Sequence, residues 1–86
     1  MAYTQSELLF LKLVGDHLKF YRLEKGFTQE ELSESAGFSR SYYTEIENGK
    51  RNVSILNLYK LASALNVPVK ELINDANAEI SPLKTK

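Results

Sequence analysis

The chain has 86 residues, 43% of them hydrophobic, which is enough for one compact core and too few for two domains. Eleven basic residues balance eleven acidic ones, so the net charge is zero, whereas a domain that binds nucleic acid is usually basic overall. The absence of cysteine excludes disulfides and thiolate metal sites, and the longest apolar cluster, residues 8–14, is too short to cross a membrane.

The first predicted helix covers residues 8–25, because apolar residues recur there at steps of three and four. Gly26 then ends it, since a glycine suits the backbone just beyond a helix. The inward stripe of this helix is Leu11, Val14, Leu18 and Tyr21.

Two short helices joined by a tight turn are predicted next. Residues 28–31 have the form of a capping box, so a second helix begins there, and it ends at Gly37, where a missing Cβ allows a positive φ. Ser39 caps a third helix that stops at the Asn48-Gly49 pair. This arrangement is the geometry of a helix-turn-helix motif, over about residues 28–48.

Two further helices follow a polar loop at residues 50–53. Ser54 caps a fourth helix that Asn66 closes, and a fifth, short helix is expected over residues 68–74. The inward residues of these two helices are Leu58, Leu61, Ala62, Leu65, Leu72 and Ile73.

The sequence shows no strand pattern and no internal repeat, so an all-α domain of five helices is predicted. Residues 1–14 form an N-terminal extension of the first helix, and residues 15–74 form the domain itself. Residues 75–86 lose the helical periodicity and are expected to be a flexible tail.

The third helix carries side chains that can read base edges in a major groove. Arg40, in its first turn, can bind the O6 and N7 atoms of a guanine. Ser41 and Thr44 are short and let the helix approach the groove floor. Glu45 can accept from cytosine N4, repel wrong sites or lie in solvent, and the position in solvent is favoured.

Other polar residues nearby suit contacts to phosphates, which set the register of a protein on DNA. Gln29 can donate its amide to a phosphate at a helix N-terminus, where anions are favoured, and the Tyr42 hydroxyl can do the same. With the basic loop included, the candidate DNA-binding residues are Gln29, Ser39, Arg40, Ser41, Tyr42, Thr44, Lys50, Arg51 and Asn52.

Four segments, residues 28–32, 36–39, 41–42 and 46–50, resemble the phage repressor/Cro-like (XRE) helix-turn-helix regulators. The resemblance covers about residues 15–73. It implies a lambda-repressor-like fold, sequence-specific DNA binding and a cytoplasmic, nucleoid-associated protein of bacterial or phage origin. Residues 22–26 and 50–54 look like those of restriction-modification controller proteins, which are small homodimers without a ligand domain.

The resemblance also implies roles for individual residues. Arg40, Tyr42, Arg51 and Asn52 stand where such relatives contact DNA. The resemblance further implies a structural ion pair between the first and third helices. Two residues depart from the family pattern: Tyr43 stands at a usually aliphatic position, and Ser33 stands where alanine is commonest. The implied ion pair joins Arg22 and Glu47.

Apolar residues exceed what one buried stripe on each helix needs, which suggests a protein partner. Near the fourth and fifth helices the candidates for a dimer interface are Ile55, Leu56 and Val69. A twofold homodimer would set two reading helices about 34 Å apart, as a pseudo-palindromic operator requires. The excess in the first helix, residues 8–13, has the alternative explanation that it covers the domain's own core.

No enzyme, cofactor, metal site, small-molecule ligand or membrane association is expected. The lone His17 is interpreted as a surface helix residue, and the early glutamates of the second helix serve its cap and dipole. The favoured function is a transcription regulator, repressor or activator or both. The alternative is a protein-interaction module, such as an antitoxin or anti-regulator, with weak DNA binding.

Overall fold

The computed structural model describes residues 2–75, and that part of the chain forms five α-helices and no strand, as predicted. The tail predicted at 75–86 lies outside the described residues except for Asp75. None of the helices described combines the length and apolar character that a membrane span needs. The helices are α1 (Gln5–Glu24), α2 (Gln29–Ala36), α3 (Arg40–Glu47), α4 (Ile55–Leu65) and α5 (Val69–Ile73).

Helix α1 begins three residues earlier than predicted, because a capping box precedes its first apolar residue. The Thr4 hydroxyl accepts from the Glu7 amide at 3.1 Å, and the Glu7 carboxylate accepts from the Thr4 amide at 2.8 Å. The prediction counted only apolar residues and missed this box. The other end agrees, with Gly26 at φ +80° just beyond the helix.

The remaining helix ends follow their predicted caps. Thr28 forms the expected capping box, and the side chains of Ser39 and Ser54 each accept a backbone amide at the start of α3 and α4. Gly37 and Asn66 both adopt the left-handed conformation that ends a helix.

Helix α5 is shorter than predicted, and one of its inward residues was assigned wrongly. Pro68 is the N-cap of the helix, not part of its first turn. Leu72 is fully buried, whereas Ile73 is 38% exposed. A helix of five residues presents too narrow a face to bury both of two adjacent side chains.

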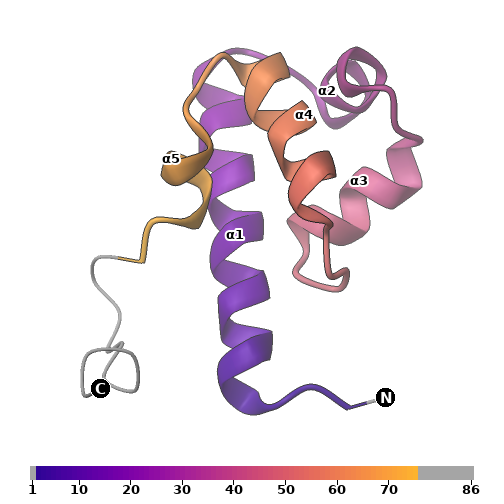
Figure 1. Ribbon diagram of the computed structural model, residues 1–86. Coiled ribbons are helices and arrows are strands. Elements are labelled where there is room, and N and C mark those ends of the chain that lie inside the picture. The colour runs from indigo at the N-terminus through magenta and orange to yellow at the C-terminus, as the bar shows by residue number, and fades with distance from the viewer. Residues whose placement is uncertain (1, 76–86) are drawn as a thin grey trace.

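The core lies where α1, α2, α3 and α4 meet, and α5 adds Leu72 to it (Figure 1). Helix α2 packs on α4 and α3, while α1 lies along α3 on one side and α5 on the other. The buried hydrophobic residues are Val14, Leu18, Leu32, Tyr43, Ile46, Leu58, Leu61, Ala62, Leu65 and Leu72. Leu11 and Tyr21, expected in the inward stripe of α1, are only partly buried.

The first turns of α1 project past the other helices (Figure 1). Leu8, Leu9 and Phe10 are 47%, 61% and 42% exposed there. The alternative that this segment covers the domain's own core therefore fails for these three residues.

Two glycines let α1 and the end of α3 approach backbone to backbone. A Cβ at Gly15 would lie 2.3 Å from the Glu47 carbonyl oxygen, and one at Gly49, where φ is +75°, would lie 2.9 Å from Lys12 Cα. Any side chain at Gly15 would push the two helices apart. Helix α1 thus fixes the position of the C-terminal end of α3.

Candidate nucleic-acid interface

The inward side of α3 is anchored by Glu47, a buried carboxylate that three other side chains bind. Arg22 donates to both of its oxygens, from Nε at 2.8 Å and from Nη2 at 3.2 Å. Gln29 Nε2 donates at 2.8 Å, and the Tyr43 hydroxyl also donates to it. The ion-paired side chains are only 9% (Arg22) and 3% (Glu47) exposed. We call these four residues the Glu47 cluster; it joins α1, α2 and α3, and it contains the ion pair that the resemblance implies.

The environment keeps each ionisable member of the Glu47 cluster in one protonation state. Burial acts to raise the pKa of Glu47, but the hydrogen bonds from Arg22, Tyr43 and Gln29 outweigh it and hold that pKa below its ordinary value. The hydrogen bond to Glu47 raises the pKa of Arg22. Burial, and then the hydrogen bond to Glu47, raises the pKa of Tyr43. The cluster at neutral pH is therefore carboxylate, guanidinium and neutral phenol.

The two departures from the family pattern have a physical explanation in these contacts. Tyr43 fills the core as an aliphatic residue would, and its hydroxyl adds a donor to Glu47. Ser33 is 1% exposed, and its hydroxyl donates to the carbonyl oxygen of Gln29 one turn earlier. Both polar atoms are satisfied, so neither residue disturbs the fold.

The outward side of α3 presents the residues predicted to read bases. Arg40 and Ser41 are exposed, and Ser39 is exposed while its hydroxyl caps the helix. Arg40 also borders an open cavity of about 430 Å³ at the start of α2. The other residues lining it are Arg22, Leu23, Phe27, Thr28, Gln29 and Glu30.

Two predicted contact residues are bound inside the protein. The Gln29 amide, expected to face a phosphate, is directed to Glu47, and its oxygen accepts from the Thr44 hydroxyl at 3.3 Å. Both residues are half-buried. In this conformation the Gln29 side chain positions Glu47. The Gln29 backbone amide, at the first turn of α2, is then the group of this residue that can meet an anion.

A second group of polar contacts lies on the exposed flank of α3. The Arg51 guanidinium lies over the Tyr42 ring, 5.1 Å from the ring centroid, and Arg51 Nε donates to the Glu45 carboxylate at 2.7 Å. The Tyr42 hydroxyl accepts from Asn57 Nδ2 at 2.9 Å. The hydrogen bond to Glu45 raises the pKa of Arg51. We call Tyr42, Glu45, Arg51 and Asn57 the Arg51 cluster.

The Arg51 cluster includes two residues whose part in it the sequence did not reveal. Asn57 lies on α4, 15 positions from Tyr42, and no local pattern marks their contact. The contact between Glu45 and Arg51 could have been predicted, because the Asn48-Gly49 pair indicates a turn after α3. At this turn the Lys50 amide donates to the Glu45 carbonyl oxygen at 2.8 Å, and Gly49 has a positive φ. Such a turn brings the next residue, Arg51, beside α3.

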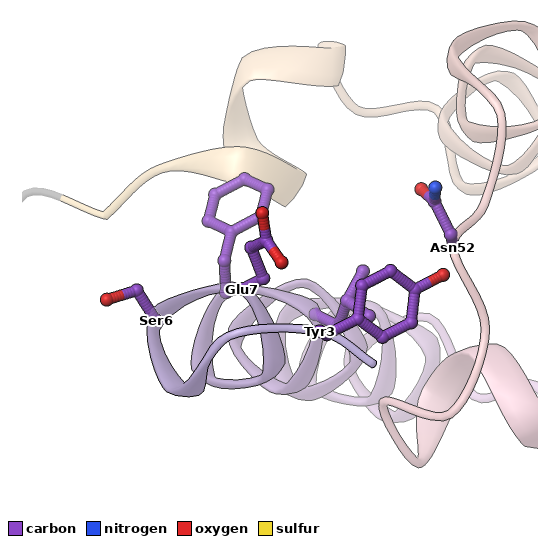
Figure 2. Close-up of a pocket in the computed structure, with 6 residues that line it drawn as sticks. Tyr3, Ser6, Glu7 and Asn52 are labelled. Carbon is purple, nitrogen blue, oxygen red and sulfur yellow. The ribbon is translucent and has the colours of Figure 1, made fainter. Parts of the chain in front are cut away.

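The rest of the basic loop is exposed at Lys50 and Asn52. Asn52 lines an open cavity of about 350 Å³ together with residues at the start of α1, and Figure 2 shows the hydroxyl end of Tyr3 pointing toward Asn52. Ser6 and Glu7 lie beside this cavity on the first turns of α1 (Figure 2). Asn52 therefore borders the start of α1 as well as the basic loop.

Of the dimer candidates, Ile55 and Leu56 are 74% and 60% exposed at the start of α4, and Tyr59, one turn on, is 58% exposed. Val69 is half-buried and packs against the core. These observations leave the start of α4 as the more exposed apolar surface of the two helices.

His17 is not the surface residue that was expected. It is half-buried, and its Nδ1 lies 3.0 Å from the carbonyl oxygen of Leu72. Together with the Tyr21 hydroxyl, which donates to Glu71 at 2.8 Å, it ties α5 to α1. Among residues 2–75, no group of three or more His, Asp or Glu side chains is placed to hold a metal ion.

Comparison with known proteins gives consistent matches. Residues 18–72 match the family model described as "Helix-turn-helix". The chain is 47% identical over 62 residues to the uncharacterized HTH-type transcriptional regulator y4dJ of Sinorhizobium fredii, an alignment that covers 72% of this chain and 80% of that protein.

Two solved structures are similar in both fold and sequence. The restriction-modification controller protein C.AhdI from Aeromonas hydrophila has a TM-score of 0.71 and 44% identity, covering 72% of this chain and 94% of that one. The biofilm regulator SinR in complex with DNA has a TM-score of 0.67 and 42% identity, covering 71% and 98%.

Proposed function

The chain belongs to the helix-turn-helix (XRE) family of DNA-binding transcriptional regulators, with its lambda-repressor-like fold, and we propose that it binds a pseudo-palindromic operator as a homodimer. Such binding represses or activates transcription, on the nucleoid in the cytoplasm. The family is one of regulators, not of enzymes. One observation carries the proposal: Glu47 fixes one side of α3 to the domain, while Arg40 and Ser41 are exposed on its other side.

Base recognition is assigned to the exposed start of α3. Arg40 lies in the first helical turn, from which a guanidinium can bind both major-groove acceptors of a guanine. Ser41 beside it is short enough to let the backbone approach. The Thr44 hydroxyl donates to Gln29, so it can donate to a base only after that hydrogen bond breaks.

Phosphate contacts are assigned to the flanks of α3. The Tyr42 hydroxyl accepts from Asn57, so its own hydrogen can be donated to a phosphate oxygen. Three more groups lie around the same helix and can bind successive phosphates of one DNA strand: the side chains of Lys50 and Arg51 and the backbone amide of Gln29. Asn52 fits this assignment least well, because it lines the cavity at the start of α1.

The homodimer is assigned to the start of α4. Ile55 and Leu56 are large, adjacent and the most exposed of the proposed interface residues. A twofold axis beside them would bring two copies of α4 together and present both α3 helices to one side. Similarity to C.AhdI favours the controller-protein subtype.

The test is to select genomic DNA fragments with the purified protein and to titrate the recovered site against scrambled DNA at two salt concentrations. A symmetric site bound about a thousandfold more tightly than scrambled DNA would support the proposal. Sedimentation of the Leu56→Glu variant tests the dimer separately, since a charge in a buried interface should give monomers.

A second candidate function, a protein-interaction module with weak DNA binding, is favoured by one observation. Leu8, Leu9 and Phe10 form an exposed apolar segment on the part of α1 that projects from the domain. Absence of any enriched DNA fragment, with a stable complex to a different protein, would put this candidate first.

A further inference from the structure

The Arg51 cluster places an acidic side chain on a surface that faces DNA in the proposed function. Glu45 and Arg51 are 49% and 52% exposed and are joined at 2.7 Å. An exposed ion pair is worth little by itself. This pair, however, occupies the arginine that the loop would offer to DNA.

Arg51 is held in place from two directions. Its guanidinium lies over the Tyr42 ring while its Nε donates to Glu45. The ring is fixed in turn by edge-on packing against Phe38, with centroids 5.2 Å apart, and by the hydrogen bond from Asn57 to the hydroxyl. The guanidinium is therefore already ordered beside Glu45 before DNA arrives.

Resting on the proposed function, we propose that Glu45 determines operator specificity by competing with DNA for Arg51. A phosphate that attracts Arg51 must draw it away from Glu45, which leaves a carboxylate facing a polyanion. Only a site that offers the carboxylate a donor, the amino group of cytosine N4 or adenine N6 in the major groove, compensates for that loss. Wrong sites are rejected because they leave the charge unpaired.

The competition also gives a function to one of the eleven acidic residues that lower the net charge. Arg40, Lys50 and Arg51 are the basic residues around the exposed side of α3, and Glu45 offsets one of them. Attraction to phosphates of any sequence depends on the number of cations that meet the backbone. Glu45 therefore weakens binding to random DNA more than binding to the operator.

The experiment compares Glu45→Gln with Glu34→Gln, which removes the same charge from an exposed position of α2. Each variant is titrated with the selected operator and with scrambled DNA over a range of salt. We expect Glu45→Gln to bind scrambled DNA about fivefold more tightly, the upper range for release of an exposed ion pair. Its salt slope on scrambled DNA should steepen by about 0.9, the value for one added phosphate contact.

The expected loss is thus one of discrimination, with operator affinity changed less than affinity for scrambled DNA. Equal effects of Glu45→Gln and Glu34→Gln on both DNAs would overturn the proposal, since a change in net charge would then explain them. An Arg51→Gln background provides a second decision. If Glu45 acts through Arg51, the difference between the two glutamate variants should vanish there, and its persistence would contradict the competition.

Failure of the proposed function would look different from failure of this inference. Wild-type protein that prefers no sequence would reject the operator-binding regulator. The competition for Arg51 would still be decided by scrambled DNA alone, because release of Arg51 predicts tighter binding to any phosphate backbone. An unchanged scrambled-DNA affinity in Glu45→Gln would then reject the competition too.

Discussion

Two carboxylates on α3, two residues apart, each bind an arginine, and the two pairs differ in almost everything else. Glu47 and Arg22 are buried within the Glu47 cluster, at 3% and 9% exposure. Glu45 and Arg51 lie half in solvent, at 49% and 52%. Because α3 turns by about 100° per residue, positions two apart face different sides of the helix. One pair fixes the helix to the domain, and the other lies on the side assigned to DNA.

The difference shows how the same chemistry serves stability in one place and recognition in another. A buried carboxylate without its partners would remain as an uncompensated charge, so the Glu47 cluster holds only when complete. An exposed pair can exchange its partner for water, salt or a phosphate at small cost. The exposed pair can therefore open when DNA binds, whereas the buried pair cannot.

The largest effect expected from this comparison is on folding. Arg22→Ala should lower the free energy of unfolding by about 3 to 5 kcal/mol, because it leaves Glu47 buried without its cation. Arg51→Ala, the matched change in the exposed pair, should cost far less, because an exposed ion pair contributes little to stability. Urea denaturation of both variants measures the difference. Similar losses for the two variants would mean that the buried and the exposed pair contribute equally to stability.

A second prediction concerns the close approach that presses α1 onto the Glu47 end of α3. Gly15→Ala should cost about 1 to 3 kcal/mol in stability, because its Cβ would meet the Glu47 carbonyl oxygen at 2.3 Å. Alanine normally stabilises a helix interior, so the sign itself is informative. Thermal and urea unfolding test it. A stabilised Gly15→Ala protein would mean that α1 and α3 can separate without loss.

The stability that Glu47 contributes should depend on pH. The pKa of Glu47 is lower in the folded chain than its ordinary value, so the unfolded chain takes up a proton first as the pH falls. The stability from Glu47 is complete above the unfolded pKa of about 4.3 and is lost as the pH falls through the lower, folded value. The stability difference between wild type and Glu47→Gln should therefore shrink in acid. A difference independent of pH from 7 to 3 would contradict the assignment.

The sequence predicted the parts of this picture that depend on local pattern. Capping boxes, left-handed glycines and apolar spacing located four of the five helices closely, and they identified the buried stripe of α4, Leu58, Leu61, Ala62 and Leu65. The Arg22–Glu47 contact came from resemblance, because residues 25 positions apart show no periodicity that would join them.

What the sequence could not predict was where polar side chains point once the helices are packed. Gln29 looked like a phosphate donor at a helix start, yet a buried carboxylate nearby binds its amide more strongly than solvent does. Gly15 could have been recognised, since a lone glycine inside a helical pattern often marks a close approach. The Tyr42–Asn57 contact depends wholly on where the tertiary fold places α4 relative to α3.

The smallest effect is predicted for Asn57, a residue that touches the exposed pair only through Tyr42. Asn57→Ala should change stability by about 1 kcal/mol or less, since it removes one neutral hydrogen bond. Operator affinity should fall by about fivefold, the equivalent of one such bond, because Tyr42 and with it Arg51 lose their fixed position. Fluorescence anisotropy with labelled operator measures the loss. Ser63→Ala, at an exposed position of the same helix, is the matched control.

The decisive version of this experiment adds Tyr42→Phe, which keeps the ring under Arg51 and removes the hydroxyl that Asn57 binds. If Asn57 acts by orienting Tyr42, the double variant should bind the operator no more weakly than Tyr42→Phe alone. Additive losses would mean that Asn57 meets DNA itself. The start of α4 would then belong to the recognition surface, together with the exposed side of α3.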